Sequence, residues 1–138
     1  MRITVDTNIL VRAAVQDDPG QSRIAARVLR DAETVAVTLP ALCELVWVLS
    51  RGYRHAAAEI APAIRHLIDS ASVVVDRPAV EAGLAALQAG GDFADGVIAF
   101  EGRRLGGEVF VSLDRHAVEL TVAGGAEARL LSAAERRR

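Results

Sequence analysis

The sequence contains no lysine, and all 16 of its basic residues are arginines. Without lysine there is no P-loop lysine and no Schiff-base chemistry. There is also no lysine of the kind that haloacid-dehalogenase phosphatases and receiver domains place beside their aspartates. Composition alone therefore excludes these classes of protein.

Cysteine is equally scarce, because Cys43 is the only one in the 138 residues. No intramolecular disulfide can form, and a cysteine zinc site is excluded. The three histidines, His55, His66 and His116, show no spacing typical of metal ligands, and we expect them on the surface or at helix ends. Neither residue type predicts a metal centre.

Long apolar runs are also missing. The N-terminus, MRITVDTNIL, meets charge at Arg2 and Asp6 before a signal-peptide core can form, and no run approaches membrane-spanning length. We therefore expect a cytoplasmic protein with no membrane partner. The net charge of −2 provides no global basic field, so any binding of nucleic acid would have to be local.

The remaining composition is that of a soluble globular protein, with 51% hydrophobic and 25% charged residues. A chain of this length can bury one core without disulfides. We expect a single domain over residues 1–134, followed by a short basic tail at residues 135–138 that is solvated.

Short β-rich runs alternate with segments of helical period. The runs cover residues 2–5, 34–37, 72–75 and 108–113, and the principal helical segments cover 22–32, 59–69, 77–88 and 93–106. In the first helical segment the apolar period places Ile24, Val28, Leu29 and Ala32 on one face. This order predicts an α/β fold, with a parallel β-sheet of four to five strands sandwiched between helices. Ligands of such sheets gather beyond the carboxyl ends of the strands.

One carboxylate, Glu44, stands inside an apolar helical segment, TLPALCELVWVLSR. The stripe with i, i+3, i+4, i+7 spacing typical of a core face consists of Leu42, Leu45, Val46 and Leu49. Glu44 lies off this stripe, yet its helical neighbours are also apolar. An ionised carboxylate in such surroundings is costly without a partner, so we expect a cation, a hydrogen-bond donor or a raised pKa.

Further carboxylates stand where strands end and helices begin. Asp6 follows the first strand and Asp114 follows the fourth, and each is explained adequately as a helix N-cap. Asp92 and Asp95 are neighbours at i and i+3 of another helix. Capping explains Asp92 well, but it explains Asp95 less well because Asp92 already serves the same amides.

At strand ends and helix starts of one parallel sheet, these carboxylates and Glu44 would converge, and their like charges would repel. A divalent cation relieves this repulsion, and ligands that are all oxygen suit Mg²⁺ or Mn²⁺ better than zinc. Such a cluster suits phosphodiester hydrolysis, with a metal hydroxide as the nucleophile. We assign supporting roles to Asn8, the only asparagine of the chain, and to Ser112.

The acidic motifs resemble those of PIN-domain ribonucleases, specifically the VapC-like toxins of bacterial type II toxin–antitoxin pairs. Four segments are similar to that family's motifs in the same order: VDTNILVR, LCELVWVL, DFADGVIAF and VSLDRHA. The resemblance places Asp6, Glu44, Asp95 and Asp114 on metal-binding and catalytic positions, with Asp92 on a more loosely acidic one. It implies Mg²⁺ or Mn²⁺ as cofactor, RNA as substrate, a homodimer, and a cognate antitoxin as partner.

The chain departs from that family at Gly96, where alanine is common. Glycine inside a helix costs roughly 0.5 to 1 kcal/mol relative to alanine, so we expect a looser helix around Asp95. In the last motif SLD replaces TFD, which keeps a hydroxyl at Ser112 but loses an aromatic ring at Leu113. Neither departure removes a carboxylate.

Two other functions remain open. A non-catalytic PIN-like binding module would have the same fold, although it has little need of all the carboxylates. A metal-dependent phosphatase acting on small substrates could use the same acids, but it would usually add a glycine loop or an Asp-x-Asp nucleophile. Four arginines near the acidic motifs could hold phosphates or could simply be exposed on helices: Arg12, Arg51, Arg54 and Arg115.

Overall fold

The structure is a computed structural model that describes residues 1–132. It consists of two compact units, which we describe separately: unit 1 is Met1–Arg77 and unit 2 is Pro78–Arg138. The expected domain end at residue 134 and the expected basic tail, 135–138, lie outside the described residues. In the part that is described, no helix is both long and apolar enough to cross a bilayer.

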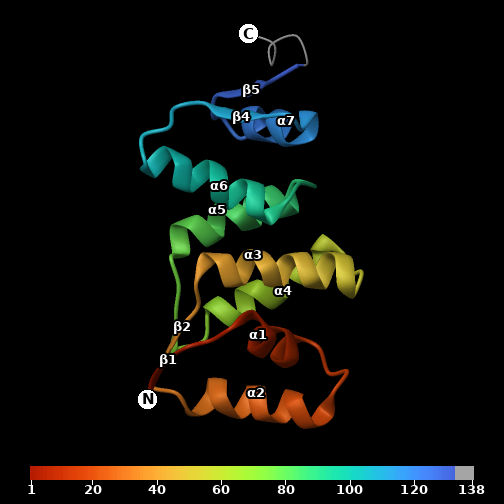
Figure 1. Cartoon of the computed structure of the whole chain (residues 1–138), viewed down its shortest axis with the longest axis vertical. Helices are drawn as coiled ribbons and strands as arrows, with labels where there is room; N and C mark the ends of the chain where they lie inside the picture. Colours follow the sequence, from red (N-terminus) through yellow and green to blue (C-terminus); the bar gives the residue numbers. More distant parts are fainter. Residues whose placement is uncertain (133–138) are drawn as a thin grey trace. The chain divides into compact units, whose positions relative to one another are not determined.

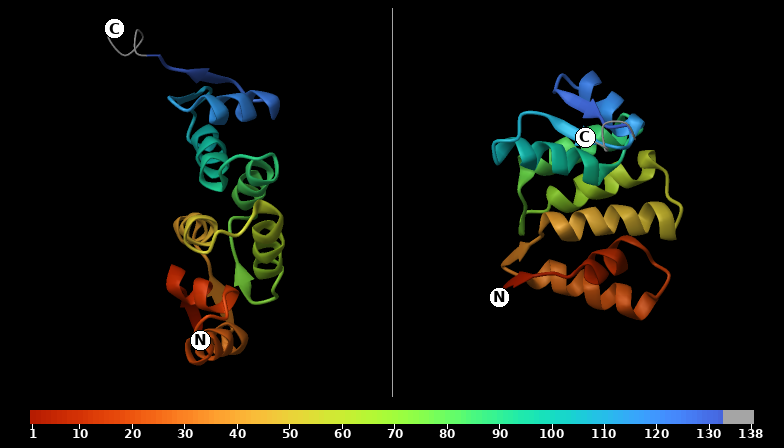
Figure 2. Two further views of the ribbon diagram at one scale, coloured as in Figure 1. Left: turned by 90° about the vertical axis from the view of Figure 1, so that its right-hand side faces the viewer. Right: turned by 45° about the horizontal axis from the view of Figure 1, so that its top comes forward.

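Unit 1 is built from short parallel strands and longer helices. Its elements are β1 (Arg2–Thr4), α1 (Thr7–Ala14), α2 (Pro19–Asp31), β2 (Thr34–Ala36), α3 (Leu39–Trp47), the π-helix η1 (Val48–Gly52), α4 (Ala57–Ile68) and β3 (Val73–Val74). The strands pair in the order β1-β2-β3, with Arg2 opposite Thr34 and Val35 opposite Val73. Helices α1 and α2 pack side by side (Figures 1 and 2).

The core of unit 1 confirms the apolar stripe of α3. All four of its members are buried: Leu42, Leu45, Val46 and Leu49. Thr38 ends the extended segment before this helix, and its hydroxyl accepts a hydrogen bond from the Ala41 N–H at 3.3 Å. The sequence pattern therefore predicted both the helix and its buried face.

The face predicted for α2 is wrong. Ile24 is 61% exposed and Val28 is 37% exposed, whereas Ser22 and Ala25 are buried. The Ser22 hydroxyl donates a hydrogen bond to the Val15 carbonyl at 3.1 Å, so a small polar residue is satisfied on the buried face. Small side chains thus form the buried face of α2 at Ser22 and Ala25, while Ile24 and Val28 remain exposed.

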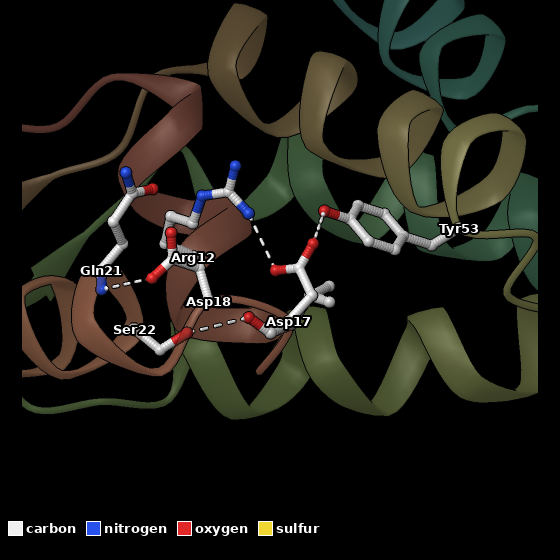
Figure 3. Close-up of polar contacts among 7 residues, drawn as sticks. Arg12, Asp17, Asp18, Gln21, Ser22 and Tyr53 are labelled. Atoms are coloured by element: carbon white, nitrogen blue, oxygen red, sulfur yellow. Dashed lines mark hydrogen bonds and ion pairs between the residues drawn. The ribbon is translucent and has the colours of Figure 1, made fainter.

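A hydrogen-bonded network fastens the loop between α1 and α2. The Arg12 guanidinium and the Tyr53 hydroxyl each donate to a different oxygen of the Asp17 carboxylate, both at 2.8 Å (Figure 3). Tyr53 follows η1, so the network joins the end of α1 to the segment after α3. Asp18, the next residue, caps α2 by accepting from the Gln21 N–H at 3.1 Å.

Unit 2 carries the remaining helices and strands. Helix α5 (Arg77–Gln88) begins at the boundary, and α6 (Phe93–Arg104), β4 (Phe110–Ser112), α7 (Arg115–Ala123) and β5 (Ala128–Leu130) follow. Strands β4 and β5 pair in parallel, with Phe110 opposite Ala128, and α7 connects them. The described residues of the two units thus confirm the α/β class with parallel strands; the five strands form one sheet of three and one of two.

Helix α6 crosses α5 at a distance that only glycine permits. A Cβ added at Gly96 would lie 2.5 Å from the Ala82 carbonyl oxygen and 2.7 Å from the Ala86 Cβ. Close by, a Cβ at Gly83 would lie 2.7 Å from the ring of Phe93, which is fully buried. The expectation that Gly96 merely loosens its helix is therefore wrong, because this glycine makes the crossing possible.

Candidate functional site

Asp6 begins helix α1 directly after strand β1. Its backbone is extended, and its Oδ1 accepts a hydrogen bond from the Thr7 N–H at 2.7 Å. The side chain is exposed, as is that of Asn8 in the first turn. The N-cap interpretation of Asp6 is confirmed, and the cap leaves Oδ2 facing no hydrogen-bond donor among the described residues.

Glu44 lies in the second turn of α3 and is exposed. The expectation that apolar surroundings impose a desolvation cost on it is therefore wrong, because its neighbours Pro40 and Trp47 are exposed as well. Among the described residues, no arginine forms an ion pair with its carboxylate. The expected cation partner of Glu44 is therefore not an arginine of the described residues.

Asp6 and Glu44 line one recess of about 410 Å³ at the ends of β1 and β2. The other lining residues are Thr4, Val5, Thr7, Thr38, Pro40 and Ala41. Parallel strands deliver their carboxyl ends to the same edge of a sheet, which explains how residues 38 positions apart meet. Unit 1 has a larger cleft of about 610 Å³, but no carboxylate lines it, so we place the candidate chemistry at the smaller recess.

In unit 2, two aspartates cap adjacent helices. Asp92 caps α6 by accepting from the Ala94 N–H at 2.9 Å, and Asp114 caps α7 by accepting from the N–H groups of His116 and Ala117 at 2.9 and 3.3 Å. All three bonds go to Oδ1. The Asp114 N–H in turn donates to the Ser112 hydroxyl at 3.0 Å, which gives Ser112 a role in shaping this turn.

Asp95 lies in the first turn of α6 and is partly buried. Burial raises the pKa of its carboxyl above the ordinary value of 3.8, and the negative charges of Asp92 and Asp114 raise it further. The two charges act only because the three carboxylates lie near one another. Asp92, Asp95 and Asp114 therefore lie near one another in unit 2, as part of the predicted convergence of carboxylates.

One contact beside these three aspartates was not predicted from the sequence. The ring of His116, the second residue of α7, lies with Nε2 3.0 Å from the carbonyl oxygen of Gly90, in the turn between α5 and α6. The sequence identified His116 only as a residue at a helix end. A contact across 26 positions leaves no local signal, so only the fold reveals it.

The donors fit a hard divalent cation. Both groups consist of carboxylates, and hydroxyl and carbonyl oxygens lie beside them, as Mg²⁺ and Mn²⁺ prefer. Within either unit, the described residues contain no three histidine, cysteine, aspartate or glutamate side chains already arranged to hold an ion. The chemistry of the donors, rather than a preformed cage, supports metal binding.

The arginines near the acidic motifs differ in their contacts. Arg12 is bound to Asp17, which raises the pKa of its guanidinium (Figure 3). Arg51, Arg54 and Arg115 are exposed. Arg12 is therefore a structural residue of the loop network, whereas the other three have the exposure that a phosphate contact requires.

A comparison with protein families identifies the fold behind this arrangement. The PIN domain matches residues 3–122, which include every carboxylate of the candidate site. The chain belongs to the PIN-domain family. PIN domains are generally nucleases, and they commonly use divalent metals. No curated protein matches the chain.

Proposed function

We propose that this PIN domain is a metal-dependent ribonuclease that hydrolyses RNA phosphodiester bonds. Asp6, Glu44, Asp95 and Asp114 bind Mg²⁺ or Mn²⁺, and Asp92 contributes more weakly. The observation that carries the proposal is the grouping of Asp95 with Asp92 and Asp114: burial raises the pKa of the Asp95 carboxyl, and the charges of the other two carboxylates raise it further. Carboxylates so close together repel one another in the absence of a cation, and such groups are typical of sites that bind one.

The capping and ligand roles of the aspartates are compatible. Asp6, Asp92 and Asp114 use only Oδ1 for the helix N–H groups, so Oδ2 remains for a ligand. The caps also fix these side chains before any ligand binds, which lowers the entropy lost on binding. A divalent cation held there supplies a Lewis acid for the phosphate and a bound water of lowered pKa.

RNA cleavage is the direct test. Wild-type protein should cleave an RNA oligonucleotide in Mn²⁺ and lose this activity in EDTA, and Asp95→Asn should lower the rate by at least about 100-fold, because metal catalysis supplies several kcal/mol. Glu119→Gln is the matched control, since Glu119 is an exposed carboxylate on α7 that is not among the proposed ligands. Equal rates for wild type and Asp95→Asn would argue for a non-catalytic binding module.

Glu44→Gln gives a second test in unit 1. The side chain is exposed and is in no ion pair among the described residues, so the free energy of unfolding in EDTA should stay unchanged. Cleavage in Mn²⁺ should nevertheless fall sharply, because the amide cannot replace a charged metal ligand. A destabilised but active Glu44→Gln protein would refute the assignment.

We further propose that the chain acts as a toxin held in check by a cognate antitoxin, and that it forms a homodimer. This rests on the resemblance of its four acidic motifs to VapC-like toxins, and on the attraction that exposed carboxylates exert on an arginine of a partner. Expression of the wild-type chain alone should arrest bacterial growth, and Asp95→Asn should relieve the arrest while Glu119→Gln should not. Normal growth with soluble, folded wild-type protein would contradict a toxin.

A further inference from the structure

His116 makes two hydrogen bonds that connect separate parts of the acidic group in unit 2. Its ring Nε2–H donates to the Gly90 carbonyl oxygen at 3.0 Å, because a carbonyl can only accept. Its backbone N–H donates to the Asp114 carboxylate at 2.9 Å. One residue thus contacts both the turn before Asp92 and the carboxylate that begins α7.

The turn that accepts the hydrogen bond from the His116 ring leads directly into α6. Gly90, which has a φ of +94°, and Gly91 lead directly into Asp92, the cap of α6, and Asp95 follows in the first turn. A displacement of this turn would therefore move both aspartates together. Its carbonyl is held by a side chain of α7, the helix that Asp114 caps.

An apolar contact keeps the same turn against α7. A Cβ added at Gly91 would lie 2.4 Å from the Leu120 Cδ1, so this side chain of α7 lies directly against the turn. The turn therefore meets α7 at two points, Leu120 and the His116 ring. Since His116 is exposed, its hydrogen bond is not needed to satisfy a buried polar group, and its main effect is on geometry.

We propose that His116 is a positioning residue that holds Asp114 at a fixed separation from Asp92 and Asp95. Beside the larger effect of burial, the charges of Asp92 and Asp114 act on the Asp95 carboxyl, so the three carboxylates repel one another, and repulsion alone would favour separation of the two helix starts. The bond from His116 to Gly90 opposes that separation, so the carboxylates have less far to move when they bind a cation. This inference rests on the proposed metal-dependent function and gives a role to His116, to which the acidic motif VSLDRHA assigned none.

The test compares three variants by their response to Mn²⁺. His116→Ala removes the ring donor, His116→Gln retains an N–H that can reach toward Gly90, and His66→Ala removes an exposed helical histidine from unit 1 as the matched control. Binding is measured without RNA, from the dependence of the melting temperature on Mn²⁺ concentration. Cleavage is measured separately at limiting and saturating Mn²⁺.

We expect His116→Ala to need about tenfold more Mn²⁺ than wild type for the same increase in melting temperature. This is the lower end of the loss of metal affinity that follows the mutation of residues that orient metal ligands. His116→Gln should recover part of this loss, and His66→Ala should behave as wild type. At saturating Mn²⁺ the cleavage rate of His116→Ala should approach that of wild type, because positioning affects metal affinity rather than the chemical step.

Each other outcome overturns the proposal in a distinguishable way. If wild type is stabilised by Mn²⁺ and cleaves RNA, but His116→Ala matches His66→Ala in its Mn²⁺ dependence, the positioning role alone is refuted. A lower rate at saturating Mn²⁺ would instead make His116 a direct participant in catalysis. If wild type neither responds to Mn²⁺ nor cleaves RNA, the proposed function fails and the positioning role fails with it.

If His116→Ala does not fold, the same comparison is made with His116→Gln. For that variant, the positioning role is refuted if both the Mn²⁺ dependence of the melting temperature and the cleavage rate at limiting Mn²⁺ equal those of wild type.

Discussion

Asp95 combines partial burial with the nearness of two other carboxylates, and both effects disfavour its ionised form in the metal-free protein. The folded protein therefore holds the Asp95 proton more tightly than the unfolded chain does. Under this linkage the Asp95 contribution to stability is fully present below pH 3.8, the ordinary pKa, and is lost as the pH rises through the higher pKa of the folded state.

Replacement of Asp95 by asparagine should remove this cost. In EDTA at neutral pH, Asp95→Asn should unfold at a higher urea concentration than wild type, with a gain that solvent screening keeps below about 1 kcal/mol. The gain should vanish in acid, where the wild-type carboxyl is protonated. A loss of stability at neutral pH would mean that Asp95 has a structural partner, contrary to the assignment.

Gly96 and Gly102 lie in the same helix but in opposite environments. A Cβ at Gly96 would contact backbone and side-chain atoms of α5 at less than 3 Å, whereas a Cβ at Gly102 would meet nothing within 4 Å. Gly96→Ala should therefore lower the free energy of unfolding by about 1 to 3 kcal/mol through overpacking. Gly102→Ala should raise it by about 0.5 to 1 kcal/mol through helix propensity. Equal effects in chemical denaturation would disprove the close crossing of α5 and α6.

At the scale of elements, the Arg12, Asp17 and Tyr53 network ties three segments of unit 1 through one carboxylate. The hydrogen bond from Tyr53, followed by that from Arg12, lowers the pKa of the Asp17 carboxyl below 3.8 despite some desolvation. The stabilisation that Asp17 provides is therefore present above pH 3.8 and is lost as the pH falls through the lower pKa of the folded state.

Asp17→Asn should accordingly lower the melting temperature at neutral pH, and the difference from wild type should shrink in strong acid. Tyr53→Phe should have an effect in the same direction, and the double variant should lose less than the sum of the two, because both remove the same bond. Asp31→Asn provides the control, since within residues 1–132 Asp31 pairs only with its exposed neighbour Arg30. Additive losses for Asp17 and Tyr53 would exclude coupling between them.

Local sequence patterns predicted helices well where one apolar face of the helix is buried. The helix expected at 77–88 has the bounds of α5, and the stripe of α3 is buried as expected. Strand β5 went unnoticed because Ala128–Leu130 places an arginine between two apolar residues and is too short for a period to emerge. The buried face of α2 was misjudged because its buried residues include the small Ser22 and Ala25, to which a hydrophobicity pattern gives little weight.

The sequence predicted those features of the candidate site that depend on neighbouring residues, namely the helix caps and the positions of the charged side chains. Asp6, Asp92 and Asp114 were expected as helix N-caps from their positions after a strand or turn, and each caps a helix in the structure. Their electrostatic coupling, the bond from His116 and the role of Gly96 depend on segments far apart in the chain. No pattern within one segment encodes these contacts.

At the scale of the whole molecule, both units carry proposed metal ligands: Asp6 and Glu44 belong to unit 1, and Asp92, Asp95 and Asp114 to unit 2. Mn²⁺ at a hundredfold excess over its dissociation constant should stabilise the protein by about 2.7 kcal/mol. Asp95→Asn should abolish most of this gain, and Glu119→Gln should retain it. A gain that survives in Asp95→Asn would show that this carboxylate is dispensable for the metal, and calorimetric melting with and without EDTA distinguishes the cases. The same measurement on Asp6→Asn tests the carboxylates of unit 1 separately.

Trp47 offers a way to observe these events without a label. It is the only tryptophan of the chain, it is 62% exposed, and it stands one helical turn beyond Glu44 on α3. Its fluorescence therefore reports on a single place in unit 1, and paramagnetic Mn²⁺ arriving at Glu44 would quench it, whereas diamagnetic Mg²⁺ would not. The same indole emission would shift to shorter wavelength when a strand of RNA or a protein chain covers that face, so the protein contains its own optical reporter.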